Sequence, residues 1–138
     1  MASIYRDGRL VTTAAVGIRE GRFFLARRKA TGAQSLRWEF PGGKCDADHD
    51  ERRCLVREFL EEFGVAITVG EELGSVPFSH GGRDYILVGY RVEIEPEPLE
   101  LREHIDSGWF LPDEVFALDL ADSDRLLFET MTLTGTVP

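Results

Sequence analysis

Three carboxylates lie close together in one acidic stretch of the chain: Glu58, Glu61 and Glu62. At about 100° per residue, a helix places all three within an arc of roughly 100° on one face. Crowded carboxylates repel one another, and a hard divalent cation such as Mg2+ relieves that repulsion because it prefers oxygen ligands and readily shares phosphate oxygens. A solvated acidic helix face is the alternative interpretation. In either case, Arg57 is placed to form an i,i+4 ion pair with Glu61.

A glycine-rich turn precedes these acids. In the sequence Pro41-Gly42-Gly43, the two glycines allow the backbone to approach a ligand closely and to turn its carbonyl and amide groups toward it. Such a loop, leading into a helix that carries carboxylates, suits metal-assisted chemistry on phosphate groups.

The carboxylate-bearing helix is expected to begin at a capping box, with Asp48 as the N-cap and Glu51 three residues later. Gly64 has the usual position of a residue that ends a helix. The apolar face of the helix, nearly opposite the acids, is predicted to consist of Val56, Phe59, Leu60 and Phe63.

The rest of the chain predicts a series of short elements. Strands are expected at residues 12–18, 22–27, 66–69, 73–78, 85–94 and 108–111, with hairpin turns at Gly21 and at residues 80–82. Residues 29–36 form a loop, residues 38–40 a short extended piece, Pro112 opens a helical turn, and residues 122–132 form the last helix. Mostly antiparallel strands with two helices indicate the α+β class.

Length and composition narrow the possibilities. The 138 residues suit one domain spanning residues 1–138, and the net charge of -9 argues against a nucleic-acid polymer or an anionic membrane as a partner. No apolar run is long enough to span a membrane, and the N-terminus lacks the apolar stretch of a signal peptide. Cys45 and Cys54 are too few for a disulfide scaffold or a structural zinc site. We interpret Cys54 as helix packing and Cys45 as incidental, and expect a reducing cytoplasm as the location.

Residues 43–65 resemble the Nudix box, whose pattern is G, five residues, E, seven residues, REUXEEXGU, where U is an apolar residue. The preceding segment WEFPGGK, residues 38–44, resembles the MutT-like branch of that family, and the resemblance extends from Thr12 to Phe128. The positions that match the box are Gly43, Arg57-Glu58-Phe59, Glu61-Glu62, Gly64 and Val65.

The box departs from the family pattern at its first glutamate. This chain has His49 at that position, and Asp48 where a glycine is usual. The family's glutamate braces the box arginine, here Arg57. A neutral His49 can accept one hydrogen bond, and Asp48, Asp50 or Glu51 could supply the lost negative charge.

The resemblance implies a Nudix fold, in which a mixed, largely antiparallel β-sheet is packed between α-helices. It implies hydrolysis of phosphoric anhydride bonds with Mg2+ or Mn2+, and Arg57 is carried over among the catalytic residues. Glu58 or Glu103 would act as general base, with His104 as a further alternative, and a plain surface acid is the alternative for Glu103. The implied metal ligands are the Gly43 carbonyl, Glu58, Glu61, Glu62 and Glu103.

Four residues are candidates for substrate binding. Arg28 matches a MutT-like position near the nucleotide, and Lys44 adjoins the glycine loop. Phe40 packs either near a base or in the core. Asp124 either accepts hydrogen bonds from a purine edge, which would favour guanine-type bases, or caps the last helix. The basic residues expected merely to flank a strand end are Arg27, Lys29 and Arg37.

The favoured function is Mg2+-dependent hydrolysis of a nucleoside triphosphate, such as 8-oxo-dGTP, to a nucleoside monophosphate and pyrophosphate. One alternative is a Nudix hydrolase of ADP-ribose or a nucleotide sugar. Another is a non-catalytic nucleotide-binding module, suggested by His49. In each case the expected partner is a small nucleotide, and the chain is expected to be a monomer or a homodimer.

Overall fold

The computed structural model describes residues 5–32, 34–45 and 50–137. Within these ranges, none of the helices is long and apolar enough to cross a membrane. In chain order the elements are β1 (Tyr5–Arg6), β2 (Arg9–Arg19), β3 (Arg22–Arg28), β4 (Trp38–Glu39), β5 (Gly42–Lys44), α1 (Glu51–Phe63), β6 (Ile67–His80), β7 (Arg83–Ile94), β8 (His104–Phe110), α2 (Pro112–Ala117) and α3 (Asp122–Leu133).

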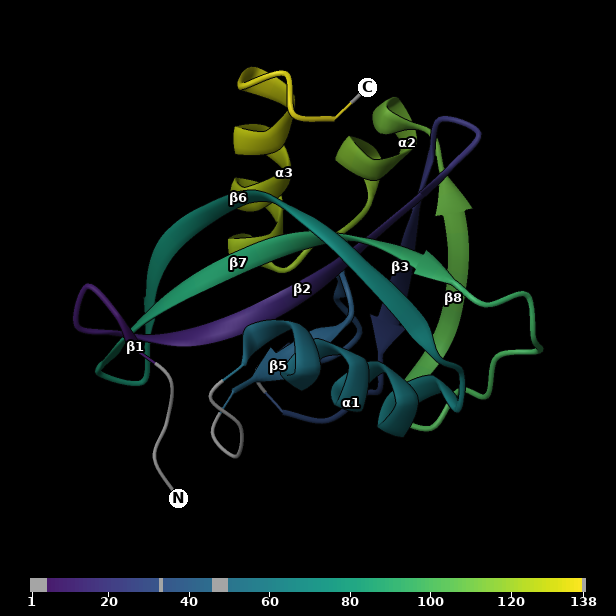
Figure 1. Cartoon of the computed structure of the whole chain (residues 1–138), viewed down its shortest axis with the longest axis horizontal. Coiled ribbons are helices and arrows are strands. Elements are labelled where there is room, and N and C mark those ends of the chain that lie inside the picture. The colour runs from purple at the N-terminus through teal and green to yellow at the C-terminus, as the bar shows by residue number, and fades with distance from the viewer. Residues whose placement is uncertain (1–4, 33, 46–49, 138) are drawn as a thin grey trace.

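A mixed sheet forms the centre of the molecule (Figure 1). The long strands β2 and β7 pair in parallel, from Leu10 opposite Tyr85 to Gly17 opposite Val92, and β6 pairs antiparallel with β7. Strand β3 turns back from the end of β2 and pairs antiparallel with β4 and β8. The prediction of a mixed, largely antiparallel sheet is therefore confirmed.

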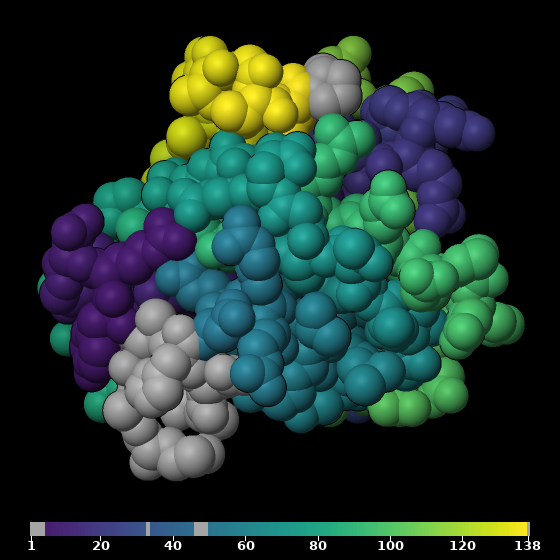
Figure 2. Space-filling view, viewed as in Figure 1, coloured from purple at the N-terminus to yellow at the C-terminus, as the bar shows by residue number. Residues whose placement is uncertain are grey.

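Helices cover both faces of the sheet, α1 on one face and α2 and α3 on the other (Figure 1). Neighbouring residues of a strand point to opposite faces. Phe24 accordingly packs against Phe59 and Phe63 of α1, whereas Phe23 packs against Phe128 of α3. The space-filling view shows α1 and β6 forming much of one face of the molecule (Figure 2).

Helix α1 begins later than the sequence predicts. Asp50 is its N-cap, and the Asp50 carboxylate accepts hydrogen bonds from the N–H groups of the second and third helical residues. The prediction of Asp48 as the cap is therefore wrong, and Asp48 itself lies outside the described residues. Gly64 ends the helix with a φ of 70°, as predicted.

The buried face of α1 also differs from the predicted one. Leu60, expected in the core, is 48% exposed, and Val56 is only half-buried. The buried face is instead turned toward Glu62, one of the acids that the sequence placed on the opposite side. The buried residues of the helix are Cys54, Leu55, Phe59, Glu62 and Phe63.

Several elements are longer than expected, among them β2, which begins at Arg9 rather than at residue 12. Strand β6 runs through both of the predicted segments 66–69 and 73–78, with register shifts between Val69 and Gly74. Strand β8 begins at His104, ahead of the predicted segment 108–111, because it continues to pair with β3 as far as Arg28. The helical turn at Pro112 is a six-residue helix, so the described residues form three helices rather than two.

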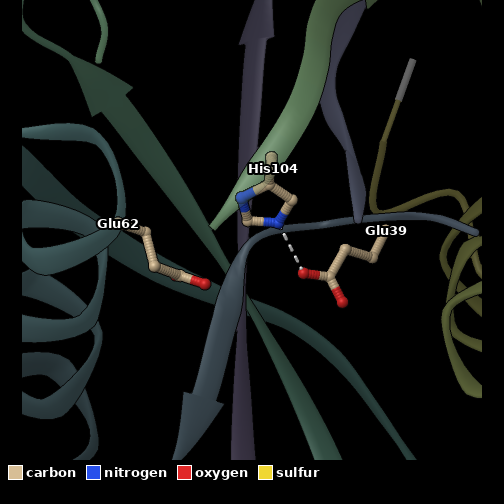
Figure 3. A group of neighbouring side chains, drawn as sticks. All are labelled: Glu39, Glu62 and His104. Atoms are coloured by element: carbon tan, nitrogen blue, oxygen red, sulfur yellow. Dashed lines mark hydrogen bonds and ion pairs between the residues drawn. The ribbon is translucent and has the colours of Figure 1, made fainter. Parts of the chain in front are cut away.

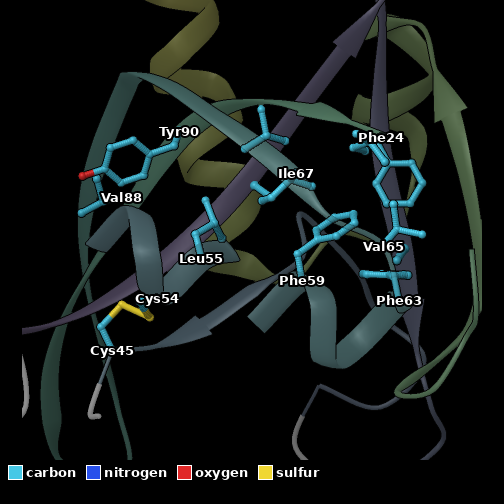
Figure 4. Close-up of a cluster of buried hydrophobic side chains, with 14 of the residues drawn as sticks. Phe24, Cys45, Cys54, Leu55, Phe59, Phe63, Val65, Ile67, Val88 and Tyr90 are labelled. Atoms are coloured by element: carbon cyan, nitrogen blue, oxygen red, sulfur yellow. A yellow bond between two sulfur atoms is a disulfide. The ribbon is translucent and has the colours of Figure 1, made fainter. Parts of the chain in front are cut away.

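The two cysteines form a disulfide (Figure 4). Cys45 follows β5 and Cys54 lies in α1, with their Cα atoms 5.7 Å apart and both side chains buried. Cys54 does pack in the core on the buried face of α1, as interpreted, but it is also bonded to Cys45, so the interpretation of Cys45 as incidental is wrong. The bond fastens β5, which carries Gly43, to the helix that carries the acids.

Removing this cross-link is expected to lower the free energy of unfolding. A bond across a sequence separation of nine residues restricts the unfolded chain and contributes about 2–3 kcal/mol in the chain-entropy model. The double variant Cys45→Ala/Cys54→Ala should therefore unfold at a lower urea concentration than the oxidised wild type. Dithiothreitol should leave the double variant unchanged, and equal midpoints for the two oxidised proteins would show that the bond adds no stability.

Candidate active site

Strand β5 and helix α1 come into close contact at Gly43. A Cβ atom at Gly43 would lie 3.1 Å from both Cδ and Oε2 of Glu58, so a side chain there would displace this carboxylate. A Cβ atom at Gly42 would collide with the carbonyl oxygen of Thr13 across the pairing of β2 and β5. The glycine pair thus allows β5 to lie close to the β2 backbone and to Glu58, and its close approach to a ligand stays a prediction.

The three acids of α1 lie in different environments. Glu62 is only 8% exposed, and its Oε2 has no hydrogen-bond partner among the described residues. Burial first, and then the charges of Glu39 and Glu58, raise the pKa of Glu62 to about 9. Glu58 is largely covered where it lies against Gly43, whereas the side chain of Glu61 is 61% exposed. The structure therefore groups Glu58 with Glu62 and leaves Glu61 at the solvent edge.

Arg57 lies on the exposed side of this group. Its Nε is 3.9 Å from Oε1 of Glu61, the i,i+4 pair that the spacing predicts. Glu51, considered as a replacement for the missing box glutamate, instead binds Arg6 at 2.8 Å. His49, which occupies the box position, lies outside the described residues.

Two further polar side chains, Glu39 and His104, approach Glu62 from other elements (Figure 3). Glu39 ends β4, His104 begins β8, and Nε2 of His104 lies 2.9 Å from Oε2 of Glu39. One possible ligand atom from each of the three residues lies within 4.8 Å of the others, an arrangement that could hold a metal ion. The sequence does not single out Glu39 within the WEFPGGK segment, because the pairing of β3 with both β4 and β8 is what unites the group.

Glu103, expected to be a ligand or a base, directly precedes β8. Its side chain is exposed, and its negative charge is among those that raise the pKa of Glu62. Glu103 therefore lies within electrostatic reach of the buried carboxyl while remaining open to solvent.

An open pocket of about 290 Å³ adjoins the acidic group. Gly43 and Glu39 line the pocket and connect it to the acids of α1. The opposite wall includes Phe78 and Tyr85, whose stacked rings have centroids 5.1 Å apart. The sequence analysis missed these two residues, although they flank the hairpin turn that it predicted. All four predicted substrate-binding residues line the same pocket: Arg28, Phe40, Lys44 and Asp124.

Asp124 is buried in the first turn of α3 rather than at its N-cap. The N-cap is Ala121, so the capping interpretation of Asp124 is wrong. Oδ1 of Asp124 accepts a hydrogen bond from the N–H of Phe40 at 2.9 Å. Burial raises the pKa of Asp124 to about 8, and the charge of Glu39 contributes to the increase. Phe40 itself lies in the core cluster beside α3, which agrees with the core-packing alternative.

The basic residues near the pocket differ in their partners. Arg28 lies 3.4 Å from Glu39, and Lys44 is exposed at the pocket wall. Arg37 instead pairs with Asp122 at 2.9 Å and holds the loop before β4 against the start of α3. Only the first two of these three cations face the space where an anionic ligand could bind.

A sheet between helices, with helix carboxylates packed against a glycine strand beside an open pocket, defines a hydrolase suited to phosphate compounds. The chain belongs to the Nudix family, because the model of the NUDIX domain matches residues 8–131. The resemblance to the Nudix family drawn from the box is thereby confirmed, and the protein is a Nudix hydrolase.

Relatives are similar along most of their length. The CTP pyrophosphohydrolase of Escherichia coli (strain K12) is 38% identical over 126 residues, which cover 91% of this chain and 93% of that protein. A Mycobacterium tuberculosis protein named "Putative 8-oxo-dGTP diphosphatase 2" is 30% identical over 118 residues, 83% of this chain and 82% of that one. The solution structure of the E. coli ORF135 protein has a TM-score of 0.81 and 36% identity, covering 94% of both chains.

Nudix hydrolases use divalent metal ions, and the residues here fit such an ion. The Oε2 atom of Glu62 is buried and finds no hydrogen-bond partner in the described part of the chain. Glu58 lies beside it, against a glycine that leaves space for the carboxylate. Oxygen donors of this kind are those that hard divalent cations prefer.

The buried carboxyl of Glu62 predicts an unusual dependence of stability on pH when no cation is present. Between about pH 4.5 and 9 the folded protein keeps a proton on Glu62 that the unfolded chain releases. This contribution to stability is complete below pH 4.5 and is lost as the pH rises toward 9. Glu62→Gln removes the titration, so the variant should gain stability over the wild type as the pH rises, by at most about 1.4 kcal/mol per pH unit.

Urea unfolding in EDTA at pH 6 and pH 8.5 measures this difference. Glu61→Gln, which changes an exposed carboxylate on the same helix, is the matched control and should follow the wild type. A constant difference between Glu62→Gln and the wild type at both pH values would contradict the prediction.

Proposed function

We propose that the protein hydrolyses a nucleoside triphosphate to a nucleoside monophosphate and pyrophosphate, with Mg2+ or Mn2+ as cofactor. The observation that carries this proposal is the position of Glu58 against Gly43, with the buried Glu62 near it, beside a pocket that also contains cationic side chains. The names of the two relatives, a CTP pyrophosphohydrolase and an 8-oxo-dGTP diphosphatase, support a triphosphate substrate.

The carboxylates of α1 would bind the cation together with the Gly43 carbonyl and Glu103, and Glu61 would contribute from the exposed edge. A cation in this position neutralises phosphate charge and lowers the pKa of a bound water. Glu58 is our candidate for the general base, because it is covered by Gly43 and yet belongs to the acidic group. Glu103, exposed at the start of β8, is the alternative base.

Binding of a triphosphate by a chain of net charge -9 requires local positive charge. Arg28 at the end of β3 and Lys44 at the end of β5 supply it, and both line the pocket. Their side chains would hold the polyphosphate over Gly43, with the nucleoside directed toward Phe78 and Tyr85.

Asp124 would contact the base at the inner end of the pocket. Because burial raises the pKa of Asp124, its protonated form, which can donate as well as accept a hydrogen bond, is favoured relative to an exposed carboxyl. A protonated Asp124 therefore suits bases with an acceptor, including cytosine, as well as the guanine-type bases favoured by an ionised carboxylate. Cytidine and 8-oxoguanine triphosphates are accordingly the two substrate classes that we propose.

Replacing Glu58 should abolish most of the activity. Glu58→Gln removes a cation ligand and the candidate base while keeping the size of the side chain, so we expect kcat to fall by about 10²- to 10⁴-fold. The measurement is pyrophosphate release from each nucleotide with Mg2+ and with Mn2+. Glu71→Gln alters an exposed acid on β6 and serves as the control. Wild-type turnover by Glu58→Gln would eliminate the proposed site.

Replacing Asp124 should weaken recognition of the preferred base. We expect Asp124→Ala to reduce kcat/KM by about tenfold or more, mainly through KM, because a buried hydrogen bond to the base is lost. A panel containing CTP, dCTP, dGTP and 8-oxo-dGTP, with the products separated by chromatography, measures this effect and identifies the bond that is cut. Asp122→Ala, which removes an exposed carboxylate two positions earlier, is the control. Equal losses on all nucleotides would argue against a role of Asp124 in base selection.

A further inference from the structure

His104 is a buried polar residue to which the proposed function gives no role. Its side chain is fully buried at the start of β8, although Glu103 before it and Ile105 after it are exposed. Burial of an imidazole is unfavourable unless its polar atoms find partners. Among the described residues, Nε2 of the ring contacts Glu39 whereas Nδ1 has no hydrogen-bond partner, and the contact with Glu39 is therefore the first clue to what His104 does.

Packing fixes the orientation of the imidazole. The ring of His104 stacks on Phe63, with centroids 5.1 Å apart and planes inclined by 12°. Its backbone pairs with Arg28 of β3, directly after a shift in register. Held in this way, the ring directs Nε2 toward Oε2 of Glu39 at 2.9 Å (Figure 3). An ionised carboxylate only accepts hydrogen bonds, so Nε2 carries the proton and donates it.

Glu39 lies between the two halves of the site. Its carboxylate belongs to the group formed with Glu62, and the same side chain lines the pocket that contains Asp124. The charge of Glu39 acts on the pKa of both of those buried carboxyls. Arg28 approaches Glu39 at 3.4 Å, so that donors from two elements, β3 and β8, restrict the orientation of one carboxylate.

We propose that His104 is a positioning residue that holds the Glu39 carboxylate between the cation-binding acids of α1 and the nucleotide pocket. The proposal rests on the proposed function and extends it to a residue outside the reacting groups. His104 acts through one hydrogen bond from Nε2 rather than by touching the substrate. Loss of an outer hydrogen bond of this kind lowers activity or metal affinity by about 10- to 100-fold.

Two substitutions separate the hydrogen bond from the packing. His104→Leu can still pack on Phe63 but has no donor, whereas His104→Gln places an N–H group near the position of Nε2. We expect kcat/KM to fall by about 10- to 100-fold in His104→Leu and to recover most of that loss in His104→Gln. Glu39→Gln should reduce kcat/KM by a similar factor, and combining it with His104→Leu should add little, because both changes break one interaction.

Binding measured without turnover distinguishes this proposal from the proposed function. The ligand is a nucleotide with an imido group between the α- and β-phosphorus atoms, added with Mg2+ in a calorimeter. We expect the wild type and His104→Gln to bind it more tightly than His104→Leu does. If the affinities follow this order but the wild type hydrolyses no nucleotide, the proposed function fails and the positioning role stands. If the wild type hydrolyses a nucleotide and His104→Leu matches it in rate and binding, the positioning role fails alone.

Two further results would overturn the role of His104. The first is equal loss in His104→Gln and His104→Leu while both keep a melting temperature close to that of the wild type. The second is a nitrogen coupling to bound Mn2+ in the electron spin echo spectrum of the wild type that disappears in His104→Leu, because it would identify the imidazole as a metal ligand. Should His104→Leu fail to fold, the comparison of Glu39→Gln with His104→Gln measures the same interaction, with loss expected only in the former.

Discussion

The carboxyl group of Glu62 is buried away from water, and the rest of the site depends on this constraint. The side chain lies on the same helix face as Phe59 and Phe63, and Glu39 and Glu58 add negative charge around it. In the chain alone, a proton is the simplest way to relieve this arrangement, which explains the raised pKa. A divalent cation also relieves it. The folding of α1 onto the sheet therefore prepares a group of carboxylates that a bound cation would stabilise.

The frame that imposes this burial is built from both faces of the sheet. Phe24 and Phe23 follow one another in β3, and because they point in opposite directions they fix α1 and α3 to the same strand. The disulfide adds a second connection between α1 and β5, close to the glycine pair. Glu58 and the Gly43 backbone are thus held from two sides, and the helix cannot shift along β5 without disturbing a buried cross-link.

Much of the fold and part of the site follow from local patterns in the sequence. The box spacing, the hairpins and the end of α1 at Gly64 depend on residues that are neighbours in the chain, and these predictions agree with the structure. The burial of Glu62 and the exposure of Leu60 could not be predicted from helical periodicity, because the tilt of α1 against the sheet decides them. The group of Glu39 with His104 depends on strand pairings between distant segments, which no local pattern encodes.

The cysteine pair shows the same limit, since the packing of α1 against β5 brings the two residues together. What local residue types do predict is which side chains bear chemistry, and Arg28, Lys44 and Asp124 accordingly line one pocket.

The parallel pairing of β2 with β7 has a further consequence for how the chain is made. Residues 10–17 of β2 pair with residues 85–92 of β7, so β2 is made early but cannot pair along this edge until most of the polypeptide has been synthesised. Such a high contact order slows folding and leaves an unpaired strand edge open to aggregation during synthesis, which makes the emerging N-terminal half a natural client for chaperones.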